Sequence, residues 1–599
     1  MNMQLTQQIL GAYQQRNYAL VINLFNAQLS IKHCEPNIGL CYANALRHSG
    51  QIKLAQRAFE LLVKRFAALP PVLNSYANFL IAQNRWDDAA KQLKGAIRLD
   101  ANFCDAYVNL ARLQLMQDKP ELAIKTYTKA AQLRPQDPNI QIGLAGALVA
   151  QSKLSDAETI FQRLLASPMG MNDYRVLTQY AGLLRTKQQY HDALALLQRA
   201  QQINPNDAEV HAMMAANYAL DQQMDKAQSC YEQAIALAPT DVTVQIEFAH
   251  FRWSQGIEQP FAPLLAAVAQ PEQQYDLTIA TLDLLINAEQ YELAQTLLTR
   301  ALPALDNDPM TLMLAARIAR LTGELERAES HITNAIKYST KPVPVSVENE
   351  RGYILLALGD GTAAQKLYRR LQQREPADQG WWTLYSTALK LTAPLSADYM
   401  ALCDYSLVHS ALIQNDKGDE FVQQLTRKLE QVHANTHHPI GQSLRNGTQT
   451  YEDIFDDQDE IIQSLKAWIK DQAESFTKHL PKQTKHPFLS RVGQDISFTG
   501  SWSVCLRTGG YHTSHFHPQG WLSGVFYVDV PEDVNHDGQG WLQFGVPEIS
   551  QLSLPADYVV KPENGRLVLF PSYMWHGTRP FNAGARRMTV AFDIIPTKM

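Results

Sequence analysis

Small alanines recur along this chain at a nearly constant step, and this period constrains the fold more than any other feature of the sequence. The first six are Ala55, Ala89, Ala123, Ala157, Ala193 and Ala227. Their separations are 34, 34, 34, 36 and 34 residues. The step resumes, after an irregular stretch near residues 245–275, at Ala294, Ala328 and Ala364. A fixed step of this length predicts stacked copies of one supersecondary unit.

Each copy has the features of a helical hairpin. A bulky aromatic residue follows the alanine by four positions in several copies, as Phe59, Tyr127, Phe161 and Tyr231. Residues four apart share a helix face, so the alanine allows close approach and the aromatic ring fills the space beside it. Prolines are expected to end the second helix of each unit, at Pro70, Pro135, Pro168, Pro205 and Pro239. The alternative is a helical domain without repeats.

The repeated segments resemble the tetratricopeptide repeat. Two of them read LARLQLMQDKPELAIKTYTKAAQLRP (110–135) and MAANYALDQQMDKAQSCYEQAIALAP (214–239). The resemblance implies an all-α tetratricopeptide solenoid over residues 1–375. It also implies a groove for a protein or peptide partner, with scaffolding or dimerisation as the alternative. Residues 376–394 are expected to form a capping helix and linker.

Composition excludes several classes of function. A chain of 599 residues is too long for one core, so two or more domains are expected. The net charge is −6 and the pI about 6.3, which predicts no nucleic-acid partner. The first residues lack a signal-peptide pattern. The sequence contains no run of about eighteen apolar residues, so no membrane span is expected. Six cysteines without a CxxC pair fit a reducing compartment, so a cytoplasmic protein is expected.

The sequence changes character after residue 495. Short β-rich runs such as SWSVCLRT, WLSGVFYVDV and RRMTVAFDII are separated by Gly, Pro, Asn and Asp. Several strands of this length with turns between them predict a sandwich or barrel. The predicted fold class is therefore multidomain α plus β, with an α solenoid followed by a β domain that has flanking helices.

Histidines gather inside the predicted β region, in GGYHTSHFHPQGW and SYMWHGTRP. Alternate residues of a strand share a face, so His515 and His517 are expected to point one way and His512 the other. With His576 from a distant strand they could occupy one triangular face around a metal ion and leave open positions. The alternative is that these are ordinary polar residues of β-strands.

The same segments resemble 2-oxoglutarate- and iron(II)-dependent oxygenases, in particular a bacterial branch with an HxH…H pattern. The shared motifs are QSLRNGTQT (442–450), GSWSV (500–504), HFHPQGWLSG (515–524), GRLVLFPSYMWHGTRPF (565–581) and RRMTVAFDI (586–594). The resemblance implies a double-stranded β-helix of the jelly-roll or cupin-like type. It covers residues 395–599, with the β core near 495–599. The implied cofactors are Fe(II), 2-oxoglutarate and dioxygen.

The resemblance also implies roles for individual residues. His515 is the first iron ligand and His576 the distal one. The wider family has an aspartate at the position of His517. Two interpretations stay open there: His517 completes a three-histidine centre, or it lies behind the ligands, leaving two protein ligands or an acid from elsewhere.

A cosubstrate site follows from the same resemblance. The family holds the far carboxylate of 2-oxoglutarate with an arginine on the last strand, where Arg586 and Arg587 stand here. Strand alternation puts Arg587 on a small, polar face with Asp593, so Arg587 is predicted to bind the carboxylate. Arg586 is then a surface cation. Tyr527 matches the tyrosine that hydrogen-bonds the same carboxylate, with a core aromatic residue as its alternative.

The leading hypothesis from the sequence is an oxidoreductase, a dioxygenase that oxidises a protein or peptide recruited by the repeats. A second hypothesis is a three-histidine, cupin-type metalloenzyme that does not use 2-oxoglutarate. A third is a repeat scaffold whose oxygenase domain is inactive. Fold similarity alone does not fix a substrate.

Overall fold

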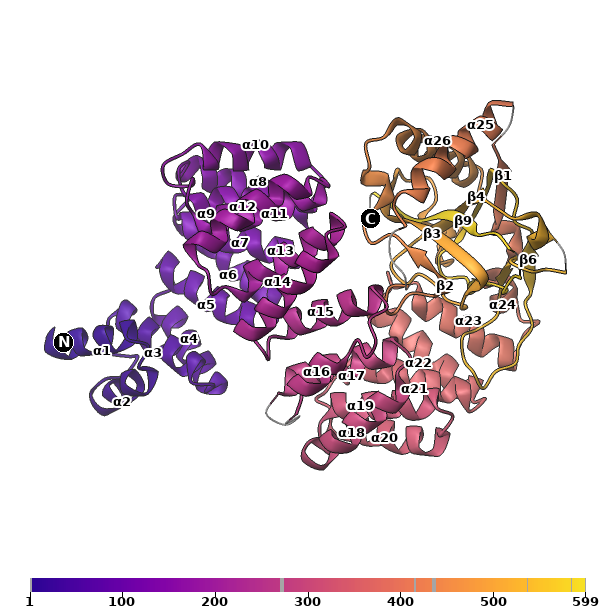
Figure 1. Ribbon diagram of the computed structural model, residues 1–599. Helices are drawn as coiled ribbons and strands as arrows, with labels where there is room; N and C mark the ends of the chain where they lie inside the picture. The colour runs from indigo at the N-terminus through magenta and orange to yellow at the C-terminus, as the bar shows by residue number, and fades with distance from the viewer. Residues whose placement is uncertain are drawn as a thin grey trace. The chain divides into compact units, whose positions relative to one another are not determined.

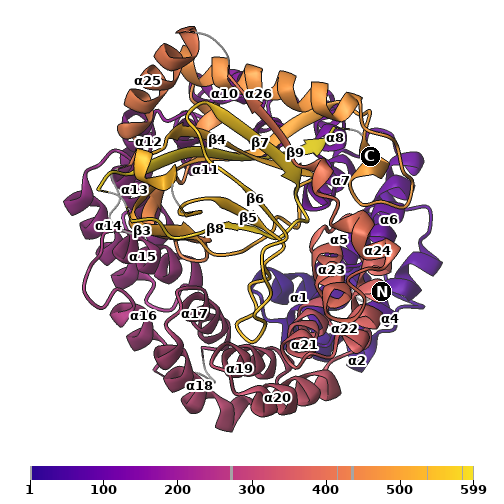
Figure 2. The same cartoon turned by 90° about the vertical axis from the view of Figure 1, so that its right-hand side faces the viewer.

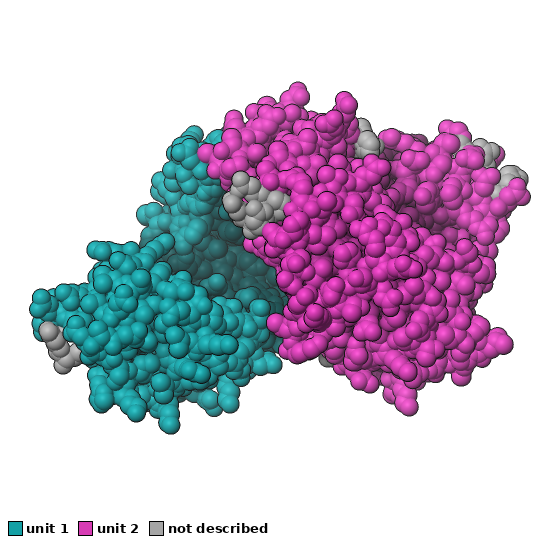
Figure 3. All heavy atoms as spheres, turned by 90° about the horizontal axis from the view of Figure 1, so that it is seen from below, with its two compact units in different colours: residues 1–221 teal, residues 222–599 magenta. Residues whose placement is uncertain are grey.

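The computed structural model describes residues 3–269, 274–413, 416–433, 438–535, 537–582 and 584–597. The chain divides into two compact units, Met1–Asp221 and Gln222–Met599 (Figures 1 and 3). The division falls within the repeat array, so the later repeats share a unit with the β region. No helix in the described ranges combines the length and hydropathy needed to cross a bilayer.

The first unit consists of helical hairpins. Its helices are α1 (Met3–Gln14), α2 (Tyr18–Gln28), α3 (Pro36–His48), α4 (Ile52–Arg65), α5 (Pro70–Ala82), α6 (Trp86–Leu99), α7 (Cys104–Met116), α8 (Pro120–Leu133), α9 (Pro138–Ala150), α10 (Leu154–Leu165), α11 (Tyr174–Thr186), α12 (Tyr190–Ile203) and α13 (Ala208–Leu220). Consecutive helices of similar length with short connections pack side by side, as expected of a solenoid.

The second unit continues the array. Its helices up to the β region are α14 (Met224–Leu237), α15 (Val242–Ser254), α16 (Ala262–Ala267), α17 (Tyr275–Asn287), α18 (Tyr291–Leu305), α19 (Pro309–Leu321), α20 (Leu325–Tyr338), α21 (Val345–Ala357), α22 (Gly361–Arg374), α23 (Gly380–Thr392) and α24 (Ala397–Leu402). The irregular stretch of the sequence contains the six-residue helix α16. Pro260 and Pro263 lie at its start, where neither can donate a backbone hydrogen bond.

The alanine series marks the second helix of each hairpin. All nine alanines have 0% exposed surface, and they lie in α4, α6, α8, α10, α12, α14, α18, α20 and α22. The aromatic residues four positions later are also buried, for example Phe59 at 0% and Tyr127 at 3%. The predicted repeat is confirmed. Pro70 differs from the expectation because it is the first residue of α5, where its fixed φ suits a helix start.

Two antiparallel sheets make up the β region (Figure 2). The larger has the order β1 (His409–Leu412), β7 (Arg566–Pro571), β4 (Leu522–Asp529), β9 (Arg587–Pro596), β3 (Ile496–His512) and β2 (Leu444–Gln449). The smaller has the order β6 (Tyr558–Val560), β5 (Leu542–Phe544) and β8 (His576–Thr578). The predicted combination of an α solenoid and a C-terminal β domain with flanking helices is confirmed.

Two helices, α25 (Asp416–Glu430) and α26 (Glu460–Lys478), lie along one face of the larger sheet (Figure 2). Trp468 of α26 packs edge-on against Phe526 of β4, with 5.8 Å between ring centroids. Phe455, just before α26, packs against Phe592 of β9 at 6.1 Å. The apolar side of β4 and β9 therefore faces these helices, which leaves the polar side of β9 for the opposite face of the sheet.

Helix α23, which the sequence suggested as the cap of the solenoid, also belongs to the core of the β domain. One hydrophobic cluster runs without a break from the last repeat through α23 to both sheets. The Thr383 hydroxyl donates to the carbonyl of Tyr573 at 2.5 Å, and the Trp575 indole donates to Thr387 at 2.8 Å. The helix thus holds the segment that leads directly to His576.

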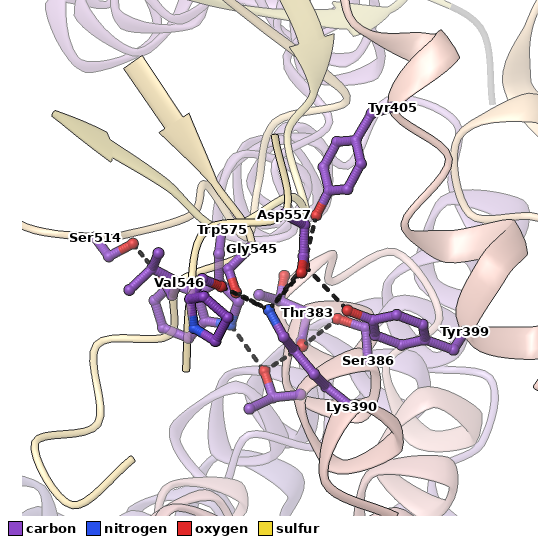
Figure 4. A network of polar contacts seen from close by, with 12 residues as sticks. Thr383, Ser386, Lys390, Tyr399, Tyr405, Ser514, Gly545, Val546, Asp557 and Trp575 are labelled. Atoms are coloured by element: carbon purple, nitrogen blue, oxygen red, sulfur yellow. Dashed lines mark hydrogen bonds and ion pairs between the residues drawn. The ribbon is translucent and has the colours of Figure 1, made fainter. Parts of the chain in front are cut away.

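Lys390 at the end of α23 makes a second attachment (Figure 4). Its ammonium group donates to the carbonyl of Gly545 and to both carboxylate oxygens of Asp557, each at 2.8 Å. The hydroxyls of Tyr399 and Tyr405 also donate to Asp557, each at 3.1 Å. This network joins α23 and α24 to the loop between β5 and β6.

Candidate metal centre

Three histidines from two distant segments meet between the sheets. The backbones of His515 and His576 form an isolated antiparallel bridge, with N–O distances of 2.8 and 2.9 Å. His517 lies 5.2 Å from His515 and 5.1 Å from His576 between ring centroids. Each of the three offers a ring nitrogen within 4.8 Å of the others. Within the described ranges, this is the one group of histidine, cysteine or acidic side chains with such spacing.

Hydrogen bonds fix the orientation of all three rings. Nδ1 of His515 lies 2.9 Å from the carbonyl of Thr513, and Nδ1 of His576 lies 2.9 Å from the carbonyl of Met574. A carbonyl oxygen can only accept, so each Nδ1 carries the proton and each Nε2 keeps its lone pair. Nδ1 of His517 is likewise engaged, by the carboxylate of Asp593. The three Nε2 atoms are therefore the ones available to a metal.

Asp593 is held in place by more than His517. Its oxygens lie 2.6 and 2.7 Å from Nδ1 of His517. The Ser523 hydroxyl donates to the same carboxylate at 2.6 Å and lies 2.8 Å from the Ser572 hydroxyl. A carboxylate behind a ligating imidazole sets its tautomer and increases its basicity.

The environment keeps two of these imidazoles neutral. Burial, with a smaller contribution from neighbouring His517, lowers the pKa of His515 to about 3. Burial also holds the pKa of His576 well below its ordinary value. A neutral imidazole is the form that binds a metal ion, so protons do not compete for the Nε2 atoms of these two residues near neutral pH.

His512 differs from the expectation. Strand alternation predicted that it points away from the other histidines, but its ring faces the same cavity, 6.0 Å from that of His515. Its Nδ1 lies 2.9 Å from the Ser443 hydroxyl. The reason is that β3 ends at His512, so the alternation of a regular strand does not continue to His515.

Alternation along β9 works as expected, because β9 is paired on both sides. Arg587 is 2% exposed and faces the cavity. Arg586, directly before β9, is half-buried, lies outside the cavity lining, and pairs with Glu430 and, at 3.5 Å, with Asp529. No acidic side chain in the described residues pairs with Arg587, and its Nε has no hydrogen-bond partner there.

Tyr527 lies beside Arg587. It is 0% exposed, and the guanidinium carbon lies 5.1 Å from the centroid of its ring. Its hydroxyl has no hydrogen-bond partner among the described residues. Burial raises the pKa of Tyr527, so the phenol keeps its proton and can donate it in a hydrogen bond.

The three histidines, Arg587 and Tyr527 line one cavity of about 600 Å³. This volume is within the usual range for small-molecule sites. The sequence pattern indicated these five residues together and placed Asp593 on the inward face of the last strand, but it assigned Asp593 no role. It also did not predict Phe516, whose ring packs edge-on against Trp575 at 4.8 Å and lies against Gly380 of α23.

Residues 500–593 match the family model described as "Putative 2OG-Fe(II) oxygenase". Tetratricopeptide-repeat models match residues 77–138, 114–168, 142–208 and 208–241. The chain thus combines segments that match tetratricopeptide-repeat models with a segment that matches the 2OG-Fe(II) oxygenase model. The segment that matches the oxygenase model contains all five cavity residues that the sequence singled out.

Other comparisons concern the repeats. The DnaJ homolog subfamily C member 7 homolog of Dictyostelium discoideum is 26% identical over 160 residues, which cover 24% of this chain and 30% of that protein. The chain thus spans less than a third of this curated relative.

Solved structures of tetratricopeptide proteins also match. YrrB is 20% identical over 31% of this chain and 95% of its own, with a TM-score of 0.25. The C-terminal part of a repeat protein from Cytophaga hutchinsonii is 19% identical, and the match covers 40% of this chain and 98% of that one, with a TM-score of 0.30. A thermophilic protein from Thermus thermophilus is 18% identical, and the match covers 31% of this chain and 99% of that one, with a TM-score of 0.28.

Proposed function

We propose that this protein is an iron(II)- and 2-oxoglutarate-dependent dioxygenase that hydroxylates a protein or peptide. The observation that carries the proposal is Arg587, a buried cation without a carboxylate partner in the cavity that the three histidines line. Removing a guanidinium from water without an anion is costly. Such an arrangement is expected where an anionic cosubstrate binds beside a metal.

The donor set fits iron. Imidazole nitrogen is a suitable ligand for Fe(II), and three such nitrogens at one face leave positions for other ligands. His515 and His576 are supported by backbone carbonyls and His517 by a carboxylate. When bound, iron supplies the chemistry of dioxygen activation, while the protein orients the reactants and excludes water.

Arg587 and Tyr527 fit the cosubstrate. The planar guanidinium can donate two parallel hydrogen bonds to the far carboxylate of 2-oxoglutarate, and the Tyr527 hydroxyl can donate another. Both side chains are buried, so these bonds form in a site where charge is poorly screened. The keto-acid end of the cosubstrate is then directed towards the histidines.

The overall reaction balances as follows. One oxygen atom of dioxygen is inserted into a C–H bond of the substrate, which becomes C–OH. The other oxygen atom enters succinate, which forms as 2-oxoglutarate loses carbon dioxide. The two electrons from oxidative decarboxylation and the two from the C–H bond together reduce dioxygen.

The proposal assigns recruitment to the repeats. Residues 1–375 would hold the partner, residues 376–394 would join the parts, and residues 395–599 would carry out the oxidation. A cytoplasmic location belongs to the same proposal, supported by six cysteines that are all free thiols.

A second candidate is a three-histidine metalloenzyme without 2-oxoglutarate. The observation that favours it is that the nearest carboxylate, Asp593, binds His517 rather than offering a ligand at the metal position. Arg587 argues against it, because an unpaired buried guanidinium has no role in such a site.

The experiment that separates the two is turnover under labelled dioxygen. Fe(II)-loaded protein with 2-oxoglutarate and substrate should produce labelled succinate and a labelled hydroxyl group in equal amounts. His576→Ala protein is the control and should produce neither. Product formation that does not require 2-oxoglutarate would support the second candidate, and no product with any substrate would favour an inactive scaffold.

A further inference from the structure

The catalytic cavity has a wall that comes from the repeat array. Beside the β-domain residues, it is lined by Ile286 and Asn287 of α17, Tyr291 of α18, and Arg317 and Leu321 of α19. Glu289, in the turn between α17 and α18, completes this wall. These residues come from one hairpin and the first helix of the next, within the same compact unit as the oxygenase domain.

The wall is rigidly built. The Arg317 guanidinium donates to the carboxylate of Asp283 at 3.0 Å and to the side-chain oxygen of Asn287 at 2.8 Å. Glu289 forms an ion pair with Arg445, which also donates to the carbonyls of Gln442 and Leu444 at 2.7 and 2.8 Å. Because these side chains hold one another, the wall keeps its shape without a ligand.

A short path connects this wall to the histidines. Arg445 and Ser443 belong to the same segment around the start of β2. The Ser443 hydroxyl lies 2.9 Å from Nδ1 of His512 and 3.4 Å from Nε2 of His515. A molecule that touches the repeat wall is therefore within a few residues of the proposed iron position.

Exposure distinguishes the mouth of the cavity from its base. Glu289 and Gln442 are exposed, and Tyr291 and Arg317 are half-buried. Arg587, Tyr527 and His576 are buried, with exposed fractions of 2%, 0% and 6%. The cosubstrate site thus lies at the base, whereas the repeat wall borders the opening through which a second molecule enters.

The chemistry of the mouth favours a polypeptide. Asp283 neutralises Arg317 and Glu289 neutralises Arg445. The mouth therefore has no strong positive potential that would attract a polyanion. Gln442 and Tyr291 supply an amide and a hydroxyl group that can pair with main-chain N–H and C=O groups. The surface is also continuous with the repeats on which a longer chain would lie.

We infer that α17–α19 form the substrate-selecting wall of the catalytic cavity, and that Tyr291 and Arg317 contact the polypeptide segment carrying the oxidised residue. This inference rests on the proposed oxygenase function. The repeats then do more than recruit a partner at a distance, because two of them border the cavity itself and decide which segment reaches the iron.

The test uses the full-length protein with Fe(II), 2-oxoglutarate, air and a random library of synthetic dodecapeptides. Mass spectrometry identifies peptides that gain one oxygen atom, and the best of them is then used for kinetics. Tyr291→Ala and Arg317→Met are expected to lower kcat/KM for this peptide by about tenfold or more, mainly through KM. Their affinities for Fe(II) and 2-oxoglutarate should equal those of the parent, which shows that the base of the cavity is intact.

Matched controls lie on the neighbouring helix α20, outside the cavity lining. Tyr338→Ala removes an exposed tyrosine and Arg327→Met breaks an exposed ion pair, so both should keep parental kinetics. Parental kcat/KM in both wall variants would overturn the inference.

Two further outcomes separate the inference from the proposed function. A parent protein that binds iron and 2-oxoglutarate, and forms succinate only with small molecules, would overturn the polypeptide assignment and leave the oxygenase function intact. A parent protein that binds no iron would fail at the titration step, which would contradict the proposed function before any peptide is tested.

Discussion

Nδ1 of His517 lies 2.6 Å from one carboxylate oxygen of Asp593 and 2.7 Å from the other. The oxygenases that this domain resembles usually place a carboxylate on iron at the position of His517. Here the negative charge stands behind an imidazole. In the proposed centre, the pair would supply both the third nitrogen ligand and a charge that partly compensates the metal.

Asp593→Asn is expected to weaken Fe(II) binding by about 10- to 100-fold, because the amide no longer enforces the tautomer or the basicity of His517. Anaerobic titration with Fe(II) measures the effect. Asp529→Asn, which changes a half-buried carboxylate on β4 outside the cavity lining, should leave the affinity unchanged. Equal affinity in the parent and Asp593→Asn would show that His517 is not a ligand or needs no support.

His576→Ala should abolish stoichiometric iron binding, because His576, which lies in the smaller sheet, is one of the three proposed ligands. Its far-ultraviolet circular dichroism should stay that of the parent, because the helices are unaffected. His512→Ala is the matched control, because His512 faces the cavity but lies outside the three-histidine group. Iron loss in both variants, or in neither, would contradict this choice of ligands.

Arg587→Met should raise the dissociation constant of 2-oxoglutarate by about 100-fold, because two charge-assisted hydrogen bonds are lost. Calorimetric titration of the Fe(II)-loaded protein gives the constant. Arg586→Met removes a half-buried cation that precedes β9 and lies outside the cavity lining, so it should change the dissociation constant little. If both variants bind 2-oxoglutarate like the parent, the cosubstrate carboxylate lies elsewhere.

Lys390→Met should lower the free energy of unfolding of the second unit by about 2 kcal/mol, because Asp557 and the Gly545 carbonyl lose a charged hydrogen-bond donor. The Lys390 side chain is only 11% exposed in this pair. Lys470→Met breaks a pair in which both side chains are about half exposed, and it should cost less than about 0.5 kcal/mol. Urea denaturation followed by tryptophan fluorescence measures both, and similar losses would contradict the role given to α23.

His433 predicts a pH dependence of stability. Burial lowers its pKa from 6.5 to about 4, and its ring nitrogens lie 2.9 Å from the hydroxyls of Thr448 and Ser503. Because the folded-state pKa is the lower one, the unfolded chain takes up a proton first as the pH falls. Stability is therefore lost from about pH 6.5 down to pH 4, on the order of 2 kcal/mol from this residue.

The comparison for that prediction is His433→Gln, which keeps a polar side chain that does not titrate. Urea denaturation at intervals between pH 7 and pH 4 gives the slope for each protein. The variant should lose less stability than the parent over this range. Parallel slopes would mean that His433 has an ordinary pKa in the folded protein.

Local periodicity in the sequence was enough to predict the regular helices and strands of the molecule. The 34-residue alanine series identified the second helix of each hairpin, because a buried small residue is required at every contact of this kind. Alternation placed Arg587 on the inward face with Asp593, because both residues lie in β9, which has partner strands on both sides. The same rule failed for His512, where β3 ends and the backbone leaves the strand.

Contacts between distant segments could not be predicted in this way. The pair formed by Glu289 and Arg445 joins residues 156 positions apart, and no local pattern in either segment requires it. The contact of α23 with Tyr573 depends likewise on how the last repeat packs against the sheets. Asp593 could be assigned to the inward face from sequence, but its partner His517 follows only from the fold.

The central claim is that Arg587 holds 2-oxoglutarate next to iron bound by His515, His517 and His576. Anaerobic addition of 2-oxoglutarate to Fe(II)-loaded protein, followed by visible absorption, tests it most directly. The account predicts a charge-transfer band that saturates at one equivalent in the parent and needs about 100-fold more 2-oxoglutarate in Arg587→Met. A parent protein that binds iron but develops no band, or an Arg587→Met protein that titrates like the parent, would contradict it.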